Sequence, residues 1–292
     1  IRDVERSRGL GDVYKRQASL LLEDFGPKSV ISRDTILVLY KALVKPTSPR
    51  TQTLFEDWRR VFSQVCAYSM KKLKGLVDYY GLKHKAIDVE KLMFAIHTYY
   101  TILMKLLTSE IVTLFADSLI GSYLKRLEDA YLRSKEEMLN ELKELEEGGI
   151  FAELGIKNFL EADYFAWYLD EWDGRLAKSI AKIIRKLSDY DPSAAELEPE
   201  RVRDLFKRLY QNLVPKNIRH DLGEYYTPDW LAELLLDEAG WKLDFFEKKA
   251  EECGSSLAPL DLRLLDPACG SGTFLVLAIG RLRRYVEEHW ID

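Results

Sequence analysis

The pattern of apolar residues changes near residue 220, and this change limits the chain to two units of different structural class. Residues 18–219 repeat apolar side chains at steps of three and four, which indicates helices. Later, the apolar run Leu262–Leu265 is followed by a glycine-rich turn and an apolar helix, the order that opens an α/β domain. We therefore expect a mainly α domain over 18–219. Residues 220–292 should then form the first βα unit of a truncated α/β domain.

Within the first part, five stretches have helical patterns: Asp34–Val44, Leu54–Tyr80, Val89–Leu107, residues 123–147 and Arg201–Leu213. The third stretch is apolar almost all round, which predicts a central, buried helix. The fourth is rich in Glu and Lys, carries leucines at helical steps and ends at Gly148 and Gly149. It predicts either a solvated helix or a short helical hairpin.

The first seventeen residues have a different character from the rest of the chain. They show no sustained apolar period, and they resemble a peptide obtained when sequencing-adapter DNA is translated. We expect residues 1–17 to be a non-native tail that packs against nothing. An ordinary flexible terminus is the alternative.

The composition is that of a globular protein, with 47% apolar residues and a net charge of -5. The charge is uneven, because residues 221–292 hold 7 basic and 15 acidic side chains. Any attraction to a phosphate backbone must therefore come mainly from the first 220 residues.

The cysteines and the apolar stretches indicate the cellular compartment in which the protein is expected. The three cysteines form no CxxC pair, which favours a reducing compartment without a disulfide framework or zinc site. The most apolar stretch, Leu92–Met104, has 13 residues and is too short to span a bilayer. A cytoplasmic protein without a membrane partner is expected.

The segment Asp266–Phe274 has the features of a ligand-binding turn. Gly270 and Gly272 allow the backbone to approach a ligand closely, and the following helix directs free N–H groups and a positive dipole end at the site. Asp266 at the strand tip can pair with a cationic or hydroxyl group. A ligand with both a carboxylate and an ammonium group suits this combination.

Other glycine-rich motifs do not match this segment. A P-loop requires a lysine after its last glycine, and the dinucleotide fingerprint requires a third glycine where Leu275 stands. Cys269 has no histidine near it in the sequence, so a small loop residue explains it better than a nucleophile. A strand–turn–helix with a structural role only remains an alternative.

Two segments together resemble a known family. Residues 266–275, DPACGSGTFL, resemble motif I of the amino-methylating DNA methyltransferases, which binds S-adenosyl-L-methionine. Residues 223–228, GEYYTP, resemble motif X, and the 39 steps from Thr227 to Asp266 fit the order and spacing of adenine-N6 enzymes. The resemblance implies that the cofactor's methionine end contacts Tyr226, Thr227 and Pro228. It assigns the other side to Asp266, Ala268, Cys269, Gly270, Ser271, Gly272, Thr273 and Phe274.

Helix capping alone explains part of the first segment. Thr227 as N-cap, Pro228 at the first helical position and Asp229 in the first turn make a well-formed start for a helix that Gly240 closes. Capping explains neither the preceding Gly-Glu-Tyr-Tyr nor the motif I sequence.

The resemblance implies a Rossmann-like class I fold and a site-specific adenine-N6 DNA methyltransferase of a restriction–modification or phage-defence system. Its partners would be double-stranded DNA and a specificity or restriction subunit. The helical part loosely resembles the segment before the methyltransferase in type IIG enzymes. The chain also resembles type I modification subunits. The catalytic (N/D/S)-P-P-(Y/F) motif does not occur in the sequence, so the chain as given is expected to be inactive. Glu288 and Asp292 are weak candidates for the ribose-binding acid.

Two alternatives remain at this stage. One is a helical scaffold or adaptor that carries a degenerate methyltransferase segment. The other is an RNA or protein methyltransferase that shares motif I, which the Tyr-Tyr-Thr-Pro element disfavours.

Basic residues at helical steps form a candidate DNA contact in the helical part: Arg175, Lys178, Lys182, Arg185 and Lys186. A solvated helix face is the simpler interpretation. The same two interpretations apply to Lys207 with Arg208, and to Lys216, Arg219 and His220.

Overall fold

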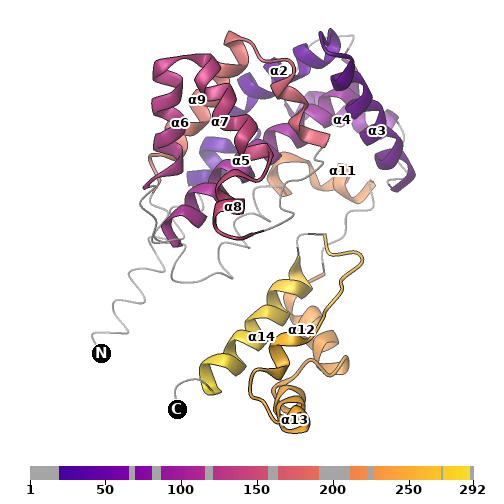
Figure 1. The fold of residues 1–292 in the computed structure, drawn as a ribbon. Helices are drawn as coiled ribbons and strands as arrows, with labels where there is room; N and C mark the ends of the chain where they lie inside the picture. Colours follow the sequence, from indigo (N-terminus) through magenta and orange to yellow (C-terminus); the bar gives the residue numbers. More distant parts are fainter. Residues whose placement is uncertain are drawn as a thin grey trace. The chain divides into compact units, whose positions relative to one another are not determined.

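The computed structural model describes residues 20–65, 70–80, 87–115, 121–156, 164–190, 211–221, 227–270 and 272–289. The chain divides into two compact units, Ile1–Gly223 and Glu224–Asp292 (Figure 1). Throughout the described residues the regular secondary structure is helical, and none of them forms a strand. The expected mainly α class of the amino-terminal part is therefore confirmed.

The described helices of the first unit follow in this order: α2 (Val30–Val44), α3 (Pro49–Val65), α4 (Met70–Tyr79), α5 (Val89–Phe115), α6 (Tyr123–Arg133), α7 (Lys135–Glu146), α8 (Gly149–Glu153), the 3-10 helix η1 (Tyr164–Leu169), α9 (Gly174–Leu187) and α11 (Lys216–Asp221). Helix α2 ends at Val44, before the Pro46–Pro49 breaker, as the sequence predicts. It begins at Val30, four residues earlier than expected, because the Ser29 side chain accepts a hydrogen bond from the Ile31 N–H and caps the helix.

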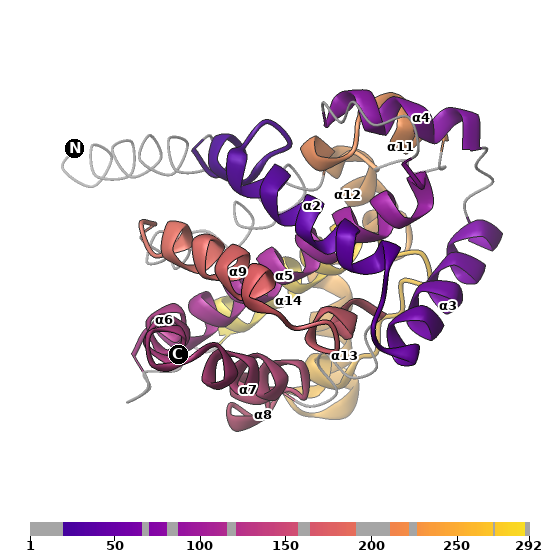
Figure 2. The same cartoon turned by 90° about the horizontal axis from the view of Figure 1, so that it is seen from above.

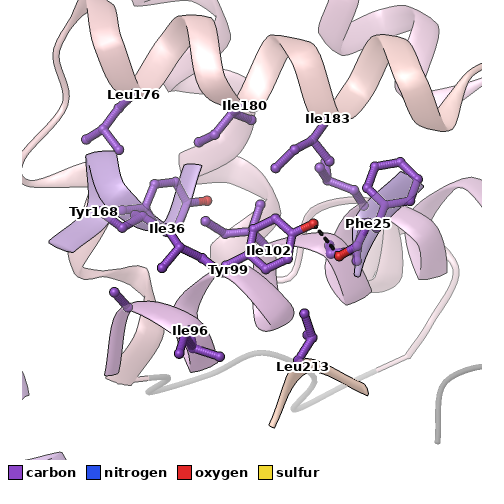
Figure 3. Packing of buried hydrophobic residues seen from close by; sticks show 14 of the residues in the cluster. Phe25, Ile36, Ile96, Tyr99, Ile102, Tyr168, Leu176, Ile180, Ile183 and Leu213 are labelled. Atoms are coloured by element: carbon purple, nitrogen blue, oxygen red, sulfur yellow. Dashed lines mark hydrogen bonds between the residues drawn. The ribbon is translucent and has the colours of Figure 1, made fainter. Parts of the chain in front are cut away.

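Helix α5 is the central element of the first unit. It packs against α2, α3, α4, α6, α8, α9 and η1, and its side chains share one core with those of α2 and α9 (Figure 3). The buried Tyr99 hydroxyl donates a hydrogen bond to the Phe25 carbonyl at 2.9 Å. The predicted central, buried helix is confirmed, and it continues beyond Leu107 to Phe115.

Helices α6 and α7 form a hairpin that turns at Ser134. The Ser134 N–H donates to the Ala130 carbonyl and ends α6, while its hydroxyl accepts from the Glu137 N–H and begins α7. The two helices lie side by side, with α9 next to α6 (Figure 2). Leu127 and Leu142 are buried, so the hairpin is part of the core. The hairpin alternative for residues 123–147 is therefore correct, and the solvated helix is not.

A carboxylate far along the chain caps the start of α3. Glu171 accepts hydrogen bonds from the N–H groups of Thr47 and Ser48 at 2.8 and 2.9 Å and from the Thr47 hydroxyl at 2.7 Å. Burial raises the pKa of Glu171, but these hydrogen bonds outweigh burial and leave the pKa below its usual value. Glu171 thus fixes the turn between α2 and α3.

The second unit contains α12 (Asp229–Glu238), α13 (Leu243–Cys253), the 3-10 helix η3 (Ala258–Asp261) and α14 (Thr273–His289). Helix α14 packs against α12 and α13 (Figure 1). Gly240 closes α12 as predicted: its φ is +80°, its N–H bonds to the Asp237 carbonyl, and the Trp241 N–H bonds to that of Leu236.

The expected strand Leu262–Leu265 is not formed. These residues are irregular, and Leu264 and Leu265 are 41% and 83% exposed. A strand exists only through hydrogen bonds to a neighbouring strand, and no described segment supplies one. The described residues therefore do not form the βα unit of the predicted α/β domain, and an irregular segment leads into α14.

Some expectations concern residues outside the described ranges. Residues 1–17 and most of the Arg201–Leu213 helix fall there, as do residues 66–69, which separate α3 from α4 within the stretch expected to be one helix. No helix in the described ranges is long and apolar enough to cross a membrane.

Candidate cofactor-binding loop

The backbone of the loop Asp266–Thr273 requires its two glycines. Gly270 has a φ of +53° and Gly272 a φ of +77°, a region that residues with a Cβ atom rarely adopt. The Gly272 N–H donates to the Cys269 carbonyl at 2.7 Å and closes a tight turn. Apart from its chain neighbours, a Cβ atom at either glycine would meet no atom of the described residues closer than 4.0 Å. The glycines are therefore required by conformation, and the space beside them is open to a ligand.

Asp266 stands at the entrance of this turn. Its Oδ1 accepts a hydrogen bond from the Ala268 N–H at 3.1 Å, which shapes the chain after Pro267. Its Oδ2 is shielded from solvent and has no hydrogen-bond partner among the described residues. A shielded carboxylate oxygen without a partner is unfavourable unless a donor reaches it. A hydrogen-bond donor from a ligand would therefore stabilise this oxygen more than any other described group of the loop.

The loop leads directly into the amino terminus of α14. The Gly272 carbonyl accepts the first helical hydrogen bond, from the Val276 N–H at 2.9 Å. The N–H groups of the first turn have no partner within a helix and lie at the positive end of its dipole. Thr273 is buried and anchors this turn, while Phe274 is half-buried. The start of α14 can therefore bind an anionic group.

The remaining members of the predicted motif I set are at the surface or outside the described residues. Ala268, Cys269 and Gly270 are exposed, and Cys269 is a free thiol. Ser271 falls outside the described residues. Glu288, considered for a ribose contact, lies about 22 Å along the axis of α14 from Thr273, so it cannot reach a ligand held at the loop. Asp292 is not described.

The second predicted segment precedes α12. Thr227 is half-buried, Pro228 is exposed and Tyr226 lies outside the described residues. Thr227 is not the N-cap: Pro228 keeps an extended ψ of 145° and takes that position without a side-chain hydrogen bond, so α12 begins at Asp229. Since no contact between this segment and the loop is described, their proximity stays a prediction.

Helices α12 and α14, which follow the two segments, are joined by a partly buried network that the sequence does not reveal. Arg281 donates to the Asp237 carboxylate at 2.7 Å, to the Trp241 carbonyl at 2.9 Å and to the Glu233 carbonyl at 3.0 Å. The Trp241 indole N–H donates to the Ala278 carbonyl at 3.0 Å. These contacts hold α14 in place behind the loop.

The basic residues of α9 lie on the side of the helix away from its buried residues, and four of the five pair with carboxylates. Arg175 pairs with Asp173 at 2.7 Å on its own helix. Lys182 pairs with Asp34 and Arg185 with Glu128, both from other elements. Lys186 pairs with Asp24 and with Asp189, which lies just after the end of α9. Lys178 is exposed and has no carboxylate partner among the described residues. This face is therefore ion-paired and almost neutral in the free protein.

Among the other basic candidates, Arg219 is not a surface group. It is buried, and its Nε donates to the Val214 carbonyl at 3.1 Å. Lys216 and His220 are exposed, while Lys207 and Arg208 lie outside the described residues. Arg219 is therefore neither part of a solvated helix face nor a phosphate contact, the two interpretations considered for it, and its role is structural.

Comparisons with protein-family models, with curated proteins and with solved structures found no match. The class of ligand is therefore inferred from the residues of the loop and their geometry.

Proposed function

We propose that the loop Asp266–Thr273 binds the amino-acid end of S-adenosylmethionine and that the chain is part of an adenine-N6 DNA methyltransferase. One observation carries the proposal. A partnerless carboxylate oxygen of Asp266 and the amino terminus of α14 lie at the two ends of one turn, and Gly270 and Gly272 hold that turn in left-handed conformations. The turn thus offers one anionic and one cationic binding group within a few residues.

The charges of the ligand match those of the loop. The ammonium group of the cofactor's methionine moiety would donate to Oδ2 of Asp266, and its carboxylate would accept from the first N–H groups of α14. The open space beside Gly270 and Gly272 would receive the ligand backbone. The residues present therefore fit this group.

The proposed role of the loop is positioning. Bound S-adenosylmethionine supplies an electrophilic methyl group for transfer to a nucleophilic amine. The loop would fix the amino-acid end of the ligand and thereby orient the reacting end, which lowers the entropic cost of transfer. The acceptor that we propose, an adenine amino group in double-stranded DNA, follows from the resemblance of Gly223–Pro228 to motif X.

The proposal includes a fold and partners for the second unit. Leu262–Leu265 would become the first strand of a Rossmann-like sheet once neighbouring strands pair with it, which would cover Leu264 and Leu265. Double-stranded DNA and a specificity or restriction subunit would be the partners, in the cytoplasm.

A matched pair of variants tests the ligand site. Gly270→Asp places a carboxylate where the ligand carboxylate would bind. Gly254→Asp makes the same change at the end of α13, where the glycine is also exposed, has a φ of +63° and is surrounded by open space. In an NMR titration with S-adenosylmethionine at millimolar concentration, Gly254→Asp should bind like wild type, whereas Gly270→Asp should lose binding. Equal affinity in both variants would exclude the loop as the site.

A helical scaffold with a degenerate methyltransferase segment is the second candidate. The observation that favours it is the exposure of Leu264 and Leu265 in a segment without a strand. This alternative predicts that millimolar S-adenosylmethionine shifts no amide signal of the loop.

A further inference from the structure

A groove of about 500 Å³ lies along the outer side of α9 in the first unit. Ile31 of α2 and Tyr131 of α6 form part of its lining, together with Lys178, Lys182, Arg185 and Lys186 of α9. The volume is within the range of ligand sites in proteins. Four cations and one carboxylate, that of Asp189, thus border one partly apolar groove in the helical unit.

The cations form a line along the helix. Lys178, Lys182 and Lys186 are each four residues apart, so they share one side of α9 and follow one another at about 6 Å. From the first to the third the helix rises about 12 Å, a length along which one DNA strand carries three to four phosphates. A linear polyanion therefore fits this line better than a single compact phosphate.

Three of these cations, Lys182, Arg185 and Lys186, form ion pairs with carboxylates in the free protein. The Lys182–Asp34 pair is about half exposed at both ends, and the Arg185–Glu128 pair is long, at 3.4 Å, with the arginine 67% exposed. Lys186 pairs with Asp24, which is 29% exposed, and with Asp189, which is 61% exposed. Exposed ion pairs contribute little, so a phosphate can replace the carboxylates of Asp34, Glu128 and Asp189. Lys178 needs no such exchange, since no described carboxylate pairs with it.

We propose that this groove binds the phosphate backbone of double-stranded DNA. The choice of DNA rests on the proposed function, whereas the groove and the line of lysines do not. Lys178 makes the first contact, and Lys182 and Lys186 exchange their carboxylates for adjacent phosphates. Contacts to three phosphates give a slope of about -2.7 when the logarithm of the association constant is plotted against that of salt concentration.

Two variants with the same change in net charge test the proposal in the full chain. Lys178→Glu with Lys182→Glu reverses two charges in the groove. The control, Arg60→Glu with Lys125→Glu, reverses two charges at exposed, ion-paired positions on α3 and α6. Fluorescence anisotropy with a labelled duplex of about 20 base pairs at low salt measures the affinity. The groove variant should bind at least tenfold more weakly than wild type, and the control within about twofold.

A single substitution shows whether weaker DNA binding results from a folding defect. Lys178→Glu breaks no described ion pair and should weaken binding by about threefold to fivefold, with an unchanged circular dichroism spectrum. Equal losses in the groove and control variants, no binding by wild type, or displacement of DNA by an equal charge of polyglutamate would each overturn the proposal. The DNA titration needs no cofactor, and Gly254→Asp, which lies outside both the groove and the loop, should leave the DNA affinity unchanged. A failed cofactor titration and a failed DNA titration are therefore distinguishable.

Discussion

His97 is a residue whose environment makes the stability of the first unit depend on pH. Its ring meets those of Trp58, Phe62 and Phe165 edge-on at centroid distances of 5.7 to 6.1 Å. Burial among these apolar rings disfavours the imidazolium and lowers the pKa of His97 from 6.5 to about 4. Its side chain is thus neutral in the folded protein near neutral pH.

Acidification should therefore destabilise the protein through His97. Below pH 6.5 His97 is protonated in the unfolded chain but stays neutral in the folded chain. The stabilisation that neutral His97 gives to the folded state is therefore complete above pH 6.5 and declines as the pH falls toward 4. Between pH 7 and pH 5 the loss should be about 2 kcal/mol. Urea unfolding at both values, with His97→Leu and the exposed His289→Gln as a control, measures it. An unchanged pH dependence in His97→Leu would contradict this assignment.

The second prediction for single residues concerns the stability contributed by the buried ion pair between Lys105 and Glu146. Both side chains are about 5% exposed, and the Tyr168 hydroxyl donates to Glu146 at 3.2 Å. Removing one partner leaves a buried charge, so Lys105→Met should cost about 3–5 kcal/mol. Lys105→Met with Glu146→Leu should be more stable than the single variant, because no charge is left unpaired. Denaturant titrations measure both, and a double variant less stable than Lys105→Met would refute this account.

At the scale of elements, Arg281 joins α12 to α14. Its hydrogen bonds to the Asp237 carboxylate and the Trp241 carbonyl are part-buried, and the one to the Glu233 carbonyl is exposed. Arg283, in contrast, makes only an exposed pair with Glu287 on its own helix. Arg281→Ala should destabilise the second unit by about 1.5–3 kcal/mol, and Arg283→Ala by less than about 0.5 kcal/mol. Hydrogen exchange of the α12 amides reports the difference. Similar protection in both variants would show that Arg281 does not hold the helices together.

The helices were predictable where their signals are local. The apolar run of α5 and the glycine that closes α12 act within one or two turns, so the sequence identifies both. The irregular structure of Leu262–Leu265, where a strand was expected, was not predictable in this way, because a strand needs a partner elsewhere in the chain. The hydrogen bonds by which Glu171 caps α3 join residues more than 120 positions apart, and no pattern in the sequence predicts them.

The candidate site shows the same division. The residues of the loop, including both glycines and Asp266, could be chosen from the sequence because their spacing is local. The partnerless Oδ2 of Asp266, the Arg281 network behind the loop and the carboxylates that neutralise α9 appear only in three dimensions.

At the scale of the whole molecule, the two units differ in the size of their cores. One large cluster unites the helices of the first unit. The buried apolar residues described in the second unit are few: Ala232, Leu236, Phe246, Ala258, Pro259, Ala278 and Tyr285. Large apolar side chains in this unit, among them Trp230 and Ile279, are exposed. The second unit therefore buries less apolar surface and should be the less stable of the two.

Unfolding should accordingly occur in two steps. Hydrogen exchange with increasing denaturant should release the amides of α12, α13 and α14 first and those of α5 last. Arg281→Ala should shift only the first step. A single cooperative step that releases all of these amides together would show that the units are not separate in stability.

The most direct test of the central claim compares a ligand that carries the amino-acid end with one that lacks it. S-adenosylmethionine and methylthioadenosine share the adenosine part, and only the first carries the ammonium and carboxylate groups that the loop would bind. In NMR titrations at millimolar concentration, S-adenosylmethionine should shift the amide signals of Gly270, Gly272 and Thr273, and methylthioadenosine should leave them unchanged. Equal shifts with both ligands, or shifts with neither, would contradict the claim that this loop recognises the amino-acid end of S-adenosylmethionine.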